Sequence, residues 1–341
     1  MYGLKRYKKK RSKNFLLWIL VILIMIFLGL VILQNDIKSD DLSRNEVIAV
    51  VYSAMENVVS ISSRNGDADI WGSGVIVSKK GYILTNEHVS GDGLNCYVYV
   101  GEKEKLKADV VWSNSDLDLA IVKVKKEFQN CAYIVDSESI KLGEDVFAIG
   151  NPINSDFEKS ISKGIISGLN RNLQFEEQGV QFYLTNMIQT DASTNVGNSG
   201  GALINSKGQL IGVTTIKIVS SEGMSFAVPA DVVKTIIDKL EESGEYAQPK
   251  IRASVYDKYT IDKLNLGIRI NEGIYVAEVD VNSNAELAGI KVGDVIVQID
   301  DNRIDSINDF RKYIFGKSIG EKVNLKIIRE RNNIEISMNL E

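Results

Sequence analysis

Histidine is almost absent from this chain, since only His88 occurs among its 341 residues. Cysteine is nearly as rare, and Cys96 and Cys131 lie far apart in the sequence. Because histidine and cysteine do not cluster, the sequence does not support a transition-metal site, and we expect no cofactor. Two isolated cysteines in an exported domain can pair or stay free, and the sequence leaves both possibilities open.

The folded part of the chain also lacks a basic face. The net charge is −5, and the one dense cluster of Lys and Arg lies at the extreme N-terminus. Nucleic acid is therefore not an expected partner, because binding phosphates needs a positive surface. A glycine loop of the phosphate-binding type is missing as well, which argues against an activity driven by ATP.

The N-terminus combines a basic segment with a long apolar run. Residues 1–13 hold seven Lys or Arg, and residues 15–33 hold no charge. Nineteen residues at about 1.5 Å each span roughly the 30 Å of a bilayer core. Residues 34–36 (QND) offer no small-residue cleavage site, which favours a retained anchor over a signal peptide. Because the basic flank stays inside, we predict a cytoplasmic tail (1–14), a transmembrane anchor (15–33) and an extracytoplasmic remainder.

The rest of the chain divides into a stalk, two modules and a linker. Residues 34–45 are polar and predict a short stalk. From residue 46, short β-branched and apolar runs are broken by Gly, Asn, Asp and Ser, the pattern of an all-β sandwich or barrel. Apolar residues at helical spacing then end at Gly244 and close a first domain over 46–243. A linker (244–250) precedes a small α+β module (251–341).

Residues 196–203 (VGNSGGAL) place three glycines around Ser199. Such a segment is either a turn or the shaped backbone of a nucleophile. A serine hydrolase also needs a base that takes the serine proton and an acid that orients the base. His88 is the only histidine available as that base. Asp118, at the start of an apolar strand-like run, is the candidate acid. Asp116 competes with it, because residues two positions apart in a strand point to the same face.

The order of these residues along the chain separates classes of hydrolase. Residues 197–201 (GNSGG) satisfy G-x-S-x-G, but α/β-hydrolases need a histidine after the serine, and none follows here. The subtilisin order needs an aspartate before the histidine, and Asp67 and Asp69 lie in a polar, loop-like run. The chymotrypsin order on a β-rich domain fits best. Gly197 can then turn its N–H inward beside that of Ser199 to form an oxyanion hole.

Four segments resemble, in order and spacing, the HtrA (Deg) family of trypsin-like serine proteases: GSGVIVSKKGYILTNEHV, DLDLAIVKV, TDASTNVGNSGGALIN and GMSFAVPAD. The later GIYVAEVDVNSNAELAGIKVGDVIVQIDDNRI resembles the PDZ domain that follows the protease in that family. The resemblance covers about residues 46–341. It implies a mainly β fold, with a chymotrypsin-like double β-barrel protease domain, a small α+β PDZ domain and an N-terminal transmembrane helix.

The resemblance implies a role for individual residues of the first domain. His88 matches the general base, Asp118 the orienting acid and Ser199 the nucleophile. The oxyanion-hole backbone matches Gly197, Asn198 and Ser199.

Within the family pattern, Asp118 is preferred to Asp116 because it directly precedes Leu-Ala. Residues 213–218 (VTTIKI) match the strand and loop that line the primary specificity pocket. The pocket candidates are Thr214, Thr215 and Ile216. Because this stretch holds no acidic residue, we expect small or medium aliphatic side chains to be favoured over Lys or Arg.

The chain departs from the family pattern at a few positions. Val196 and Ala202 stand where the family usually has proline, which leaves the three candidate catalytic residues intact. The PDZ carboxylate-binding loop corresponds either to residues 252–256 (RASVY), which lack the usual glycine, or to residues 266–268 (LGI). The sequence does not decide between them.

One helix of the second module is predicted over residues 306–317 (SINDFRKYIFGK). Its residues Ile307, Phe310 and Ile314 recur at helical spacing. A module of about ninety residues needs nearly all its apolar side chains for its own core. We therefore expect at least two of these three residues to pack there.

The leading hypothesis is a membrane-anchored, ATP-independent serine endopeptidase that degrades unfolded or damaged extracytoplasmic proteins in quality control and the stress response. The resemblance implies three partners: unfolded or misfolded substrates, peptide C-termini bound by the PDZ domain, and two further copies in a homotrimer. The alternative is a chaperone-like or scaffold protein that holds misfolded chains with weak or no proteolysis. Cleavage of unfolded casein discriminates the two hypotheses.

Overall fold

The computed structural model describes Leu23, Met25 and residues 45–66, 68–93, 95–101, 104–151, 159–177, 180–195, 197–217 and 223–341. The predicted tail, all of the predicted stalk except Asn45, and all of the predicted anchor except Leu23 and Met25 lie outside the described residues. Among the described residues, no helix is long and apolar enough to cross a membrane. The chain forms two compact units, residues 1–52 and 53–341. In the first unit, residues 45–52 are helical.

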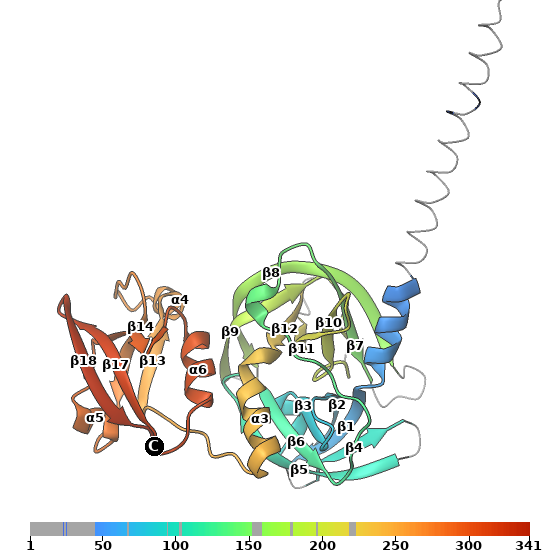
Figure 1. The fold of residues 1–341 in the computed structure, drawn as a ribbon, viewed down its shortest axis with the longest axis horizontal. Helices are drawn as coiled ribbons and strands as arrows, with labels where there is room; N and C mark the ends of the chain where they lie inside the picture. The colour runs from blue at the N-terminus through green and yellow to red at the C-terminus, as the bar shows by residue number, and fades with distance from the viewer. Residues whose placement is uncertain are drawn as a thin grey trace, which may run out of the picture. The chain divides into compact units, whose positions relative to one another are not determined.

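The second unit begins with a closed six-stranded barrel in the order β1-β2-β3-β6-β5-β4 (Figure 1). Its strands are β1 (Val58–Asn65), β2 (Ala68–Ile76), β3 (Tyr82–Thr85), β4 (Tyr97–Val100), β5 (Glu104–Asn114) and β6 (Leu119–Val124). A single helical turn, α2 (Glu87–Ser90), follows β3. Side chains such as Ile61, Ile83 and Val122 are fully buried inside the barrel.

A second closed barrel follows in the order β10-β11-β12-β9-β8-β7. Its strands are β7 (Asp145–Gly150), β8 (Ser160–Glu177), β9 (Val180–Thr190), β10 (Ala202–Asn205), β11 (Leu210–Lys217) and β12 (Ser225–Pro229). Short 3-10 turns, η1 (Ser137–Ser139) and η3 (Ala230–Val233), lie before and after it. The predicted closing helix is present as α3 (Lys234–Ser243), and Gly244 ends it with a φ of 80°.

The C-terminal module is a sheet in the order β13-β14-β15-β17-β18, with β16 paired to β15. Its elements are β13 (Ala253–Asp257), α4 (Lys258–Lys263), β14 (Ile274–Val279), α5 (Asn284–Ala288), β15 (Val295–Ile299), β16 (Asn302–Arg303), α6 (Ile307–Phe315), β17 (Lys322–Arg329) and β18 (Asn332–Asn339). A capping box at Ser306 begins α6. Ile314 and Phe310 both pack against the core of the module, so the expectation for this helix is confirmed.

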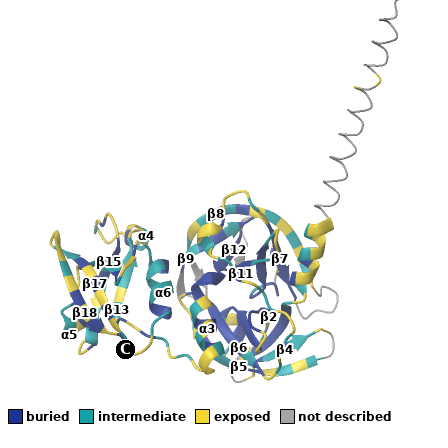
Figure 2. Cartoon of the chain, viewed as in Figure 1, coloured by how far each residue is buried: buried dark blue, intermediate teal, exposed yellow. Residues whose placement is uncertain are grey.

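Two closed barrels followed by a small α+β sheet confirm the predicted mainly β fold. Figure 2 shows buried residues along the strands of both barrels. The two cysteines do not pair. Cys96 is buried in the first barrel, and this burial raises the pKa of its thiol to about 12. Cys131 packs against the same core, so both act as small apolar side chains.

Candidate active site

His88 and Asp118 meet because β3 and β6 are antiparallel neighbours. Thr85, at the end of β3, pairs with Ala120, near the start of β6. The residues just beyond these two strand ends therefore lie side by side. His88 Nδ1 lies 2.8 Å from Asp118 Oδ1 and 3.0 Å from Asp118 Oδ2.

The Asp118 carboxylate is held by further donors in a nearly closed environment, since only 12% of its side chain is exposed. The His88 backbone N–H donates to Oδ1 at 3.2 Å, and the Thr215 hydroxyl of β11 donates to Oδ2. Asn86 Nδ2 donates to the Asp118 carbonyl at 2.8 Å. The structure thus brings Asp118 to His88. Asp116, the competing candidate, lines a separate cavity.

Ser199 lies in the segment before β10, where glycine is required by space as well as by backbone angles. Gly197 and Gly200 have φ values of 93° and 83°, which disfavour other residues. A Cβ on Gly200 would lie 2.1 Å from the Ser73 carbonyl oxygen of the first barrel. The Ser73 N–H donates to the Ser199 carbonyl at 2.8 Å. The glycines therefore let this segment lie directly against β2.

The three residues expected to form an oxyanion hole differ in their hydrogen bonds. The Asn198 N–H donates to the Asn195 carbonyl at 2.9 Å, inside a turn. Within the described part of the chain, no backbone carbonyl accepts from the N–H of Gly197 or Ser199. The N–H of Asn198 therefore supports the turn, and the N–H groups of Gly197 and Ser199 remain the candidate oxyanion donors.

Strand β11 connects the two halves of the site. The Ser199 hydroxyl donates to the Thr215 carbonyl at 3.1 Å, while the Thr215 side chain bonds Asp118. The Thr214 hydroxyl donates to the Asn198 carbonyl at 2.7 Å. The hydroxyls of Thr214 and Thr215, two of the three predicted pocket residues, therefore hold the site together. The side chain of Ile216, the third pocket candidate, lies outside the described residues, as do Val196 and Asp67.

Sequence reasoning missed Ser73, which joins the Ser199 segment to both barrels. Ser73 is fully buried, donates to the Gly197 carbonyl at 2.7 Å and accepts from the Asn151 N–H at 2.8 Å. The Thr85 hydroxyl donates to the Ser73 carbonyl at 2.7 Å. A serine between two glycines in an otherwise apolar run was the available signal, since a buried hydroxyl needs partners.

Glu87 adds a second carboxylate beside Asp118. Burial raises the pKa of Glu87, and the negative charge of Asp118 raises it further, while His88 acts in the opposite direction. Because the site already holds one carboxylate, a second one is costly to ionise.

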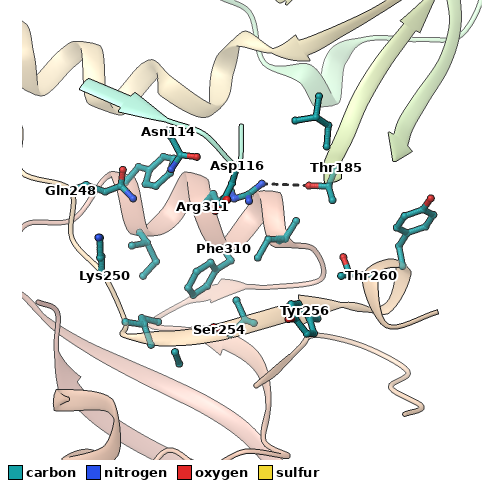
Figure 3. Close-up of a pocket in the computed structure, with 18 of the residues that line it drawn as sticks. Asn114, Asp116, Thr185, Gln248, Lys250, Ser254, Tyr256, Thr260, Phe310 and Arg311 are labelled. Atoms are coloured by element: carbon teal, nitrogen blue, oxygen red, sulfur yellow. Dashed lines mark hydrogen bonds between the residues drawn. The ribbon is translucent and has the colours of Figure 1, made fainter. Parts of the chain in front are cut away.

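A cavity of about 560 Å³ lies between β13 and α6, and the loop that contains Asp116 also lines it (Figure 3). Residues 252–256 line this cavity, whereas residues 266–268 do not, so the structure favours RASVY as the candidate carboxylate-binding loop. Arg311 of α6 donates to the Thr185 hydroxyl at 3.4 Å. Burial lowers the pKa of this guanidinium, and the charges of Asp116 and Asp257 oppose that shift.

Comparisons with known proteins agree with this architecture. Residues 72–213 match the trypsin-like peptidase domain, and residues 250–340 match the PDZ domain. "Serine protease Do-like HtrA" of Lactobacillus helveticus is 33% identical over 299 residues, which are 83% of this chain and 71% of that protein. "Serine protease Do-like HtrB" of Bacillus subtilis is 38% identical over 275 residues, which are 76% of this chain and 59% of that protein.

Solved structures show the same similarity. The crystal structure of the serine endoprotease from Yersinia pestis has 30% identity and a TM-score of 0.60, over 86% of this chain and 97% of that one. The HtrA-type protease AlgW with a tripeptide has 28% identity and a TM-score of 0.64, over 86% and 96% of the two chains. Both likenesses extend over the two barrels and the C-terminal module together.

Proposed function

The chain belongs to the HtrA family of trypsin-like serine proteases, and from this premise we propose that it is a membrane-anchored, ATP-independent endopeptidase. In this proposal it cuts unfolded or damaged proteins outside the cytoplasm, as part of quality control under stress. His88 is the general base, Asp118 the orienting acid and Ser199 the nucleophile.

One observation carries the proposal. His88 and Asp118 from the first barrel and Ser199 from the second are linked through one residue of β11, Thr215. Its side chain holds Asp118 and its carbonyl holds the Ser199 hydroxyl. This arrangement supports a reaction in which both barrels contribute to one centre.

The chemistry follows from these contacts. Asp118 accepts from His88 Nδ1, which leaves Nε2 as the ring nitrogen that takes the proton of Ser199 during attack on a peptide carbonyl. The developing oxyanion accepts from the N–H groups of Gly197 and Ser199. His88 then gives the proton to the leaving amine, and water hydrolyses the acyl-enzyme through the same base.

The Ser199 hydroxyl carries one proton, and in the structure it donates that proton to the Thr215 carbonyl. A single O–H cannot donate to this carbonyl and to His88 at once. Attack therefore requires rotation of the Ser199 side chain away from Thr215.

The C-terminal module supports a role in substrate capture. Its cavity lies between a strand and a helix, the arrangement in which a peptide adds as an extra strand with its apolar C-terminal residue in a pocket. In the proposal this groove binds peptide C-termini and the first domain builds a homotrimer. The primary pocket favours small or medium aliphatic residues.

The test is proteolysis by the full-length chain in detergent micelles, with unfolded casein as substrate. Ser199→Ala and His88→Ala are each expected to lower kcat/KM by about 10⁴-fold or more. Ser206→Ala, which changes an exposed serine after β10, is the matched control and keeps full activity. Substantial cleavage by His88→Ala contradicts the proposal, because no second histidine can replace it. A wild-type chain that suppresses casein aggregation without cleaving it supports the chaperone-like alternative.

A further inference from the structure

One face of the first barrel runs outward from the Ser199 segment. Alternation along β1 and β2 puts the side chains of Ser60 and Ser62, and of Ser73 and Trp71, on one face. Ser73 pairs with Ser60, and Trp71 pairs with Ser62. At the inner end of this face, the hydroxyls of Ser60 and Ser73 bond Asn151 and Gly197 of the second barrel.

The same face continues across β4 and β5. Ser60 pairs with Tyr99 and Ser62 with Tyr97, and Tyr99 in turn pairs with Lys105. The rings of Trp71 and Tyr99 lie 6.1 Å apart between centroids. We call Trp71, Tyr97, Tyr99 and Lys105 the aromatic strip. It is continuous, through the strand register, with the residues that hold the Ser199 segment.

Within the aromatic strip, Trp71 offers the accessible ring. Lys105 Nζ lies 4.1 Å from the Tyr97 ring centroid and 5.5 Å from that of Tyr99, so this cation covers both tyrosines. Trp71 is 46% exposed. A large aromatic side chain on a regular strand beside a candidate active site is an unusual surface feature, since such rings are normally buried.

His88 must protonate the leaving amine, and His88 and the aromatic strip both belong to the first barrel. We therefore assign the strip to the leaving-group side of the scissile bond. The backbone next to Trp71 is close to the Ser199 segment and to the helical turn that carries His88. A Cβ on Gly72 would lie 2.9 Å from the Ser199 carbonyl oxygen and 2.7 Å from the side chain of Val89, the neighbour of His88.

We propose that the aromatic strip is a substrate subsite in which Trp71 binds an aromatic side chain on the leaving-group side of the scissile bond. The inference deepens the proposed protease function and rests on it. Stacking on a ring contributes to binding without selecting one sequence, which suits an enzyme that acts on unfolded chains with newly exposed aromatic residues.

The experiment uses the full-length chain and internally quenched peptides that share one acyl half. Their leaving-group halves carry either Phe or Ala at the first, second or third position after the cleaved bond. Mass spectrometry of the products identifies the cleaved bond. For each enzyme the readout is the ratio of kcat/KM for the Phe and Ala peptides. Because both peptides meet the same enzyme preparation, this ratio does not depend on the fraction of folded protein.

The expected wild-type ratio is about tenfold at one of the three positions. In Trp71→Ala the ratio falls to about one, and in Trp71→Tyr most of it is kept. Tyr133→Ala, which removes an exposed aromatic ring elsewhere on the protease domain, is the matched control and leaves the wild-type ratio unchanged.

Two results overturn the inference. One is a wild type without any preference for Phe, and the other is a preference that Trp71→Ala keeps. An acyl p-nitroanilide, which has no leaving-group chain, separates this failure from that of the proposed function. If the wild type hydrolyses the anilide but shows no Phe preference, only the subsite is wrong. If it hydrolyses neither the anilide nor any peptide, the protease proposal fails and the subsite fails with it.

Discussion

At the scale of single residues, the candidate site depends on hydroxyl groups that hold its backbone and its carboxylate in place. Ser73 and Thr215 each bond to a segment far away in the sequence, at Gly197 and Asp118 respectively. In the proposed mechanism neither residue takes part chemically in peptide hydrolysis. Their proposed contribution is to hold the oxyanion donors and the acid where the reaction needs them.

Replacing Ser73 with alanine should affect catalysis more than stability. The change removes the donor to the Gly197 carbonyl and releases the peptide unit beside the oxyanion hole, so we expect kcat to fall about tenfold or more with little change in KM. Ser60→Ala is the control, because Ser60 also bonds across the barrels, to the Asn151 carbonyl at 2.6 Å, but does not touch the Ser199 segment. Equal losses of kcat in the two variants would show that Ser73 acts only through barrel packing.

Glu87 gives a prediction for the pH dependence of stability. Its pKa is raised in the folded state, first by burial and then by Asp118. The ionised carboxylate therefore costs folding free energy that is absent below the unfolded pKa of about 4.3 and grows as pH rises through the folded value. Glu87→Gln should raise the free energy of unfolding at pH 7 and leave it nearly unchanged at pH 4.

Urea unfolding of the full-length chain at the two pH values measures this effect. The control is Glu138→Gln, which changes an exposed glutamate of η1 and should show no such difference between pH 4 and pH 7. A Glu87→Gln variant that is destabilised at pH 7 contradicts the prediction.

At the scale of elements, helix α6 of the C-terminal module is joined to the protease domain by an ion pair. Lys312 Nζ lies 2.6 Å from Asp231 Oδ2, and the Asp231 side chain is only 5% exposed. The backbone N–H and the hydroxyl of Ser137 also donate to that oxygen, each at 2.8 Å. These contacts connect α6, η3 and η1.

Replacing the lysine of this ion pair should lower the free energy of unfolding. Lys312→Met leaves the Asp231 carboxylate buried without a cation, so we expect a loss of about 2–4 kcal/mol in the free energy of unfolding. In the double variant Lys312→Met/Asp231→Asn the buried charge is gone, and part of the loss should be recovered. Urea unfolding of both single variants and the double variant measures the coupling. Strictly additive losses would show that the two side chains do not interact in solution.

At the scale of the whole molecule, the N-terminal segment is predicted to hold the protease at the membrane. The uncharged run over residues 15–33 follows a strongly basic segment, which predicts a retained anchor with its N-terminus inside. We expect the full-length chain to remain in the membrane fraction after alkaline washing. Added protease should reach the residues after 34 from outside and leave an N-terminal tag protected. A mature soluble form that starts after residue 33 contradicts this prediction.

The sequence by itself determined the order of domains, the strand-rich fold and the identity of the candidate base and nucleophile. These features depend either on neighbouring residues or on a residue type that occurs only once in the sequence. Short apolar runs between turn residues indicate strands, α3 and α6 follow from helical spacing, and one histidine leaves no choice of base. The family motifs added the double barrel of the protease domain and the small α+β sheet of the second module, and the structure confirms both.

Only the tertiary structure decided how distant segments meet. Asp116 and Asp118 are two positions apart, so strand alternation alone does not distinguish them. The pairing of β3 with β6 is what brings Asp118 to His88. The proposed roles of Ser73 and Trp71 depend likewise on the register of β1 and β2 and on the contact between the barrels. These contacts join residues from 30 positions apart, as for His88 and Asp118, to 124 positions apart, as for Ser73 and Gly197. Their geometry comes from packing the whole chain, which no local pattern of residues records.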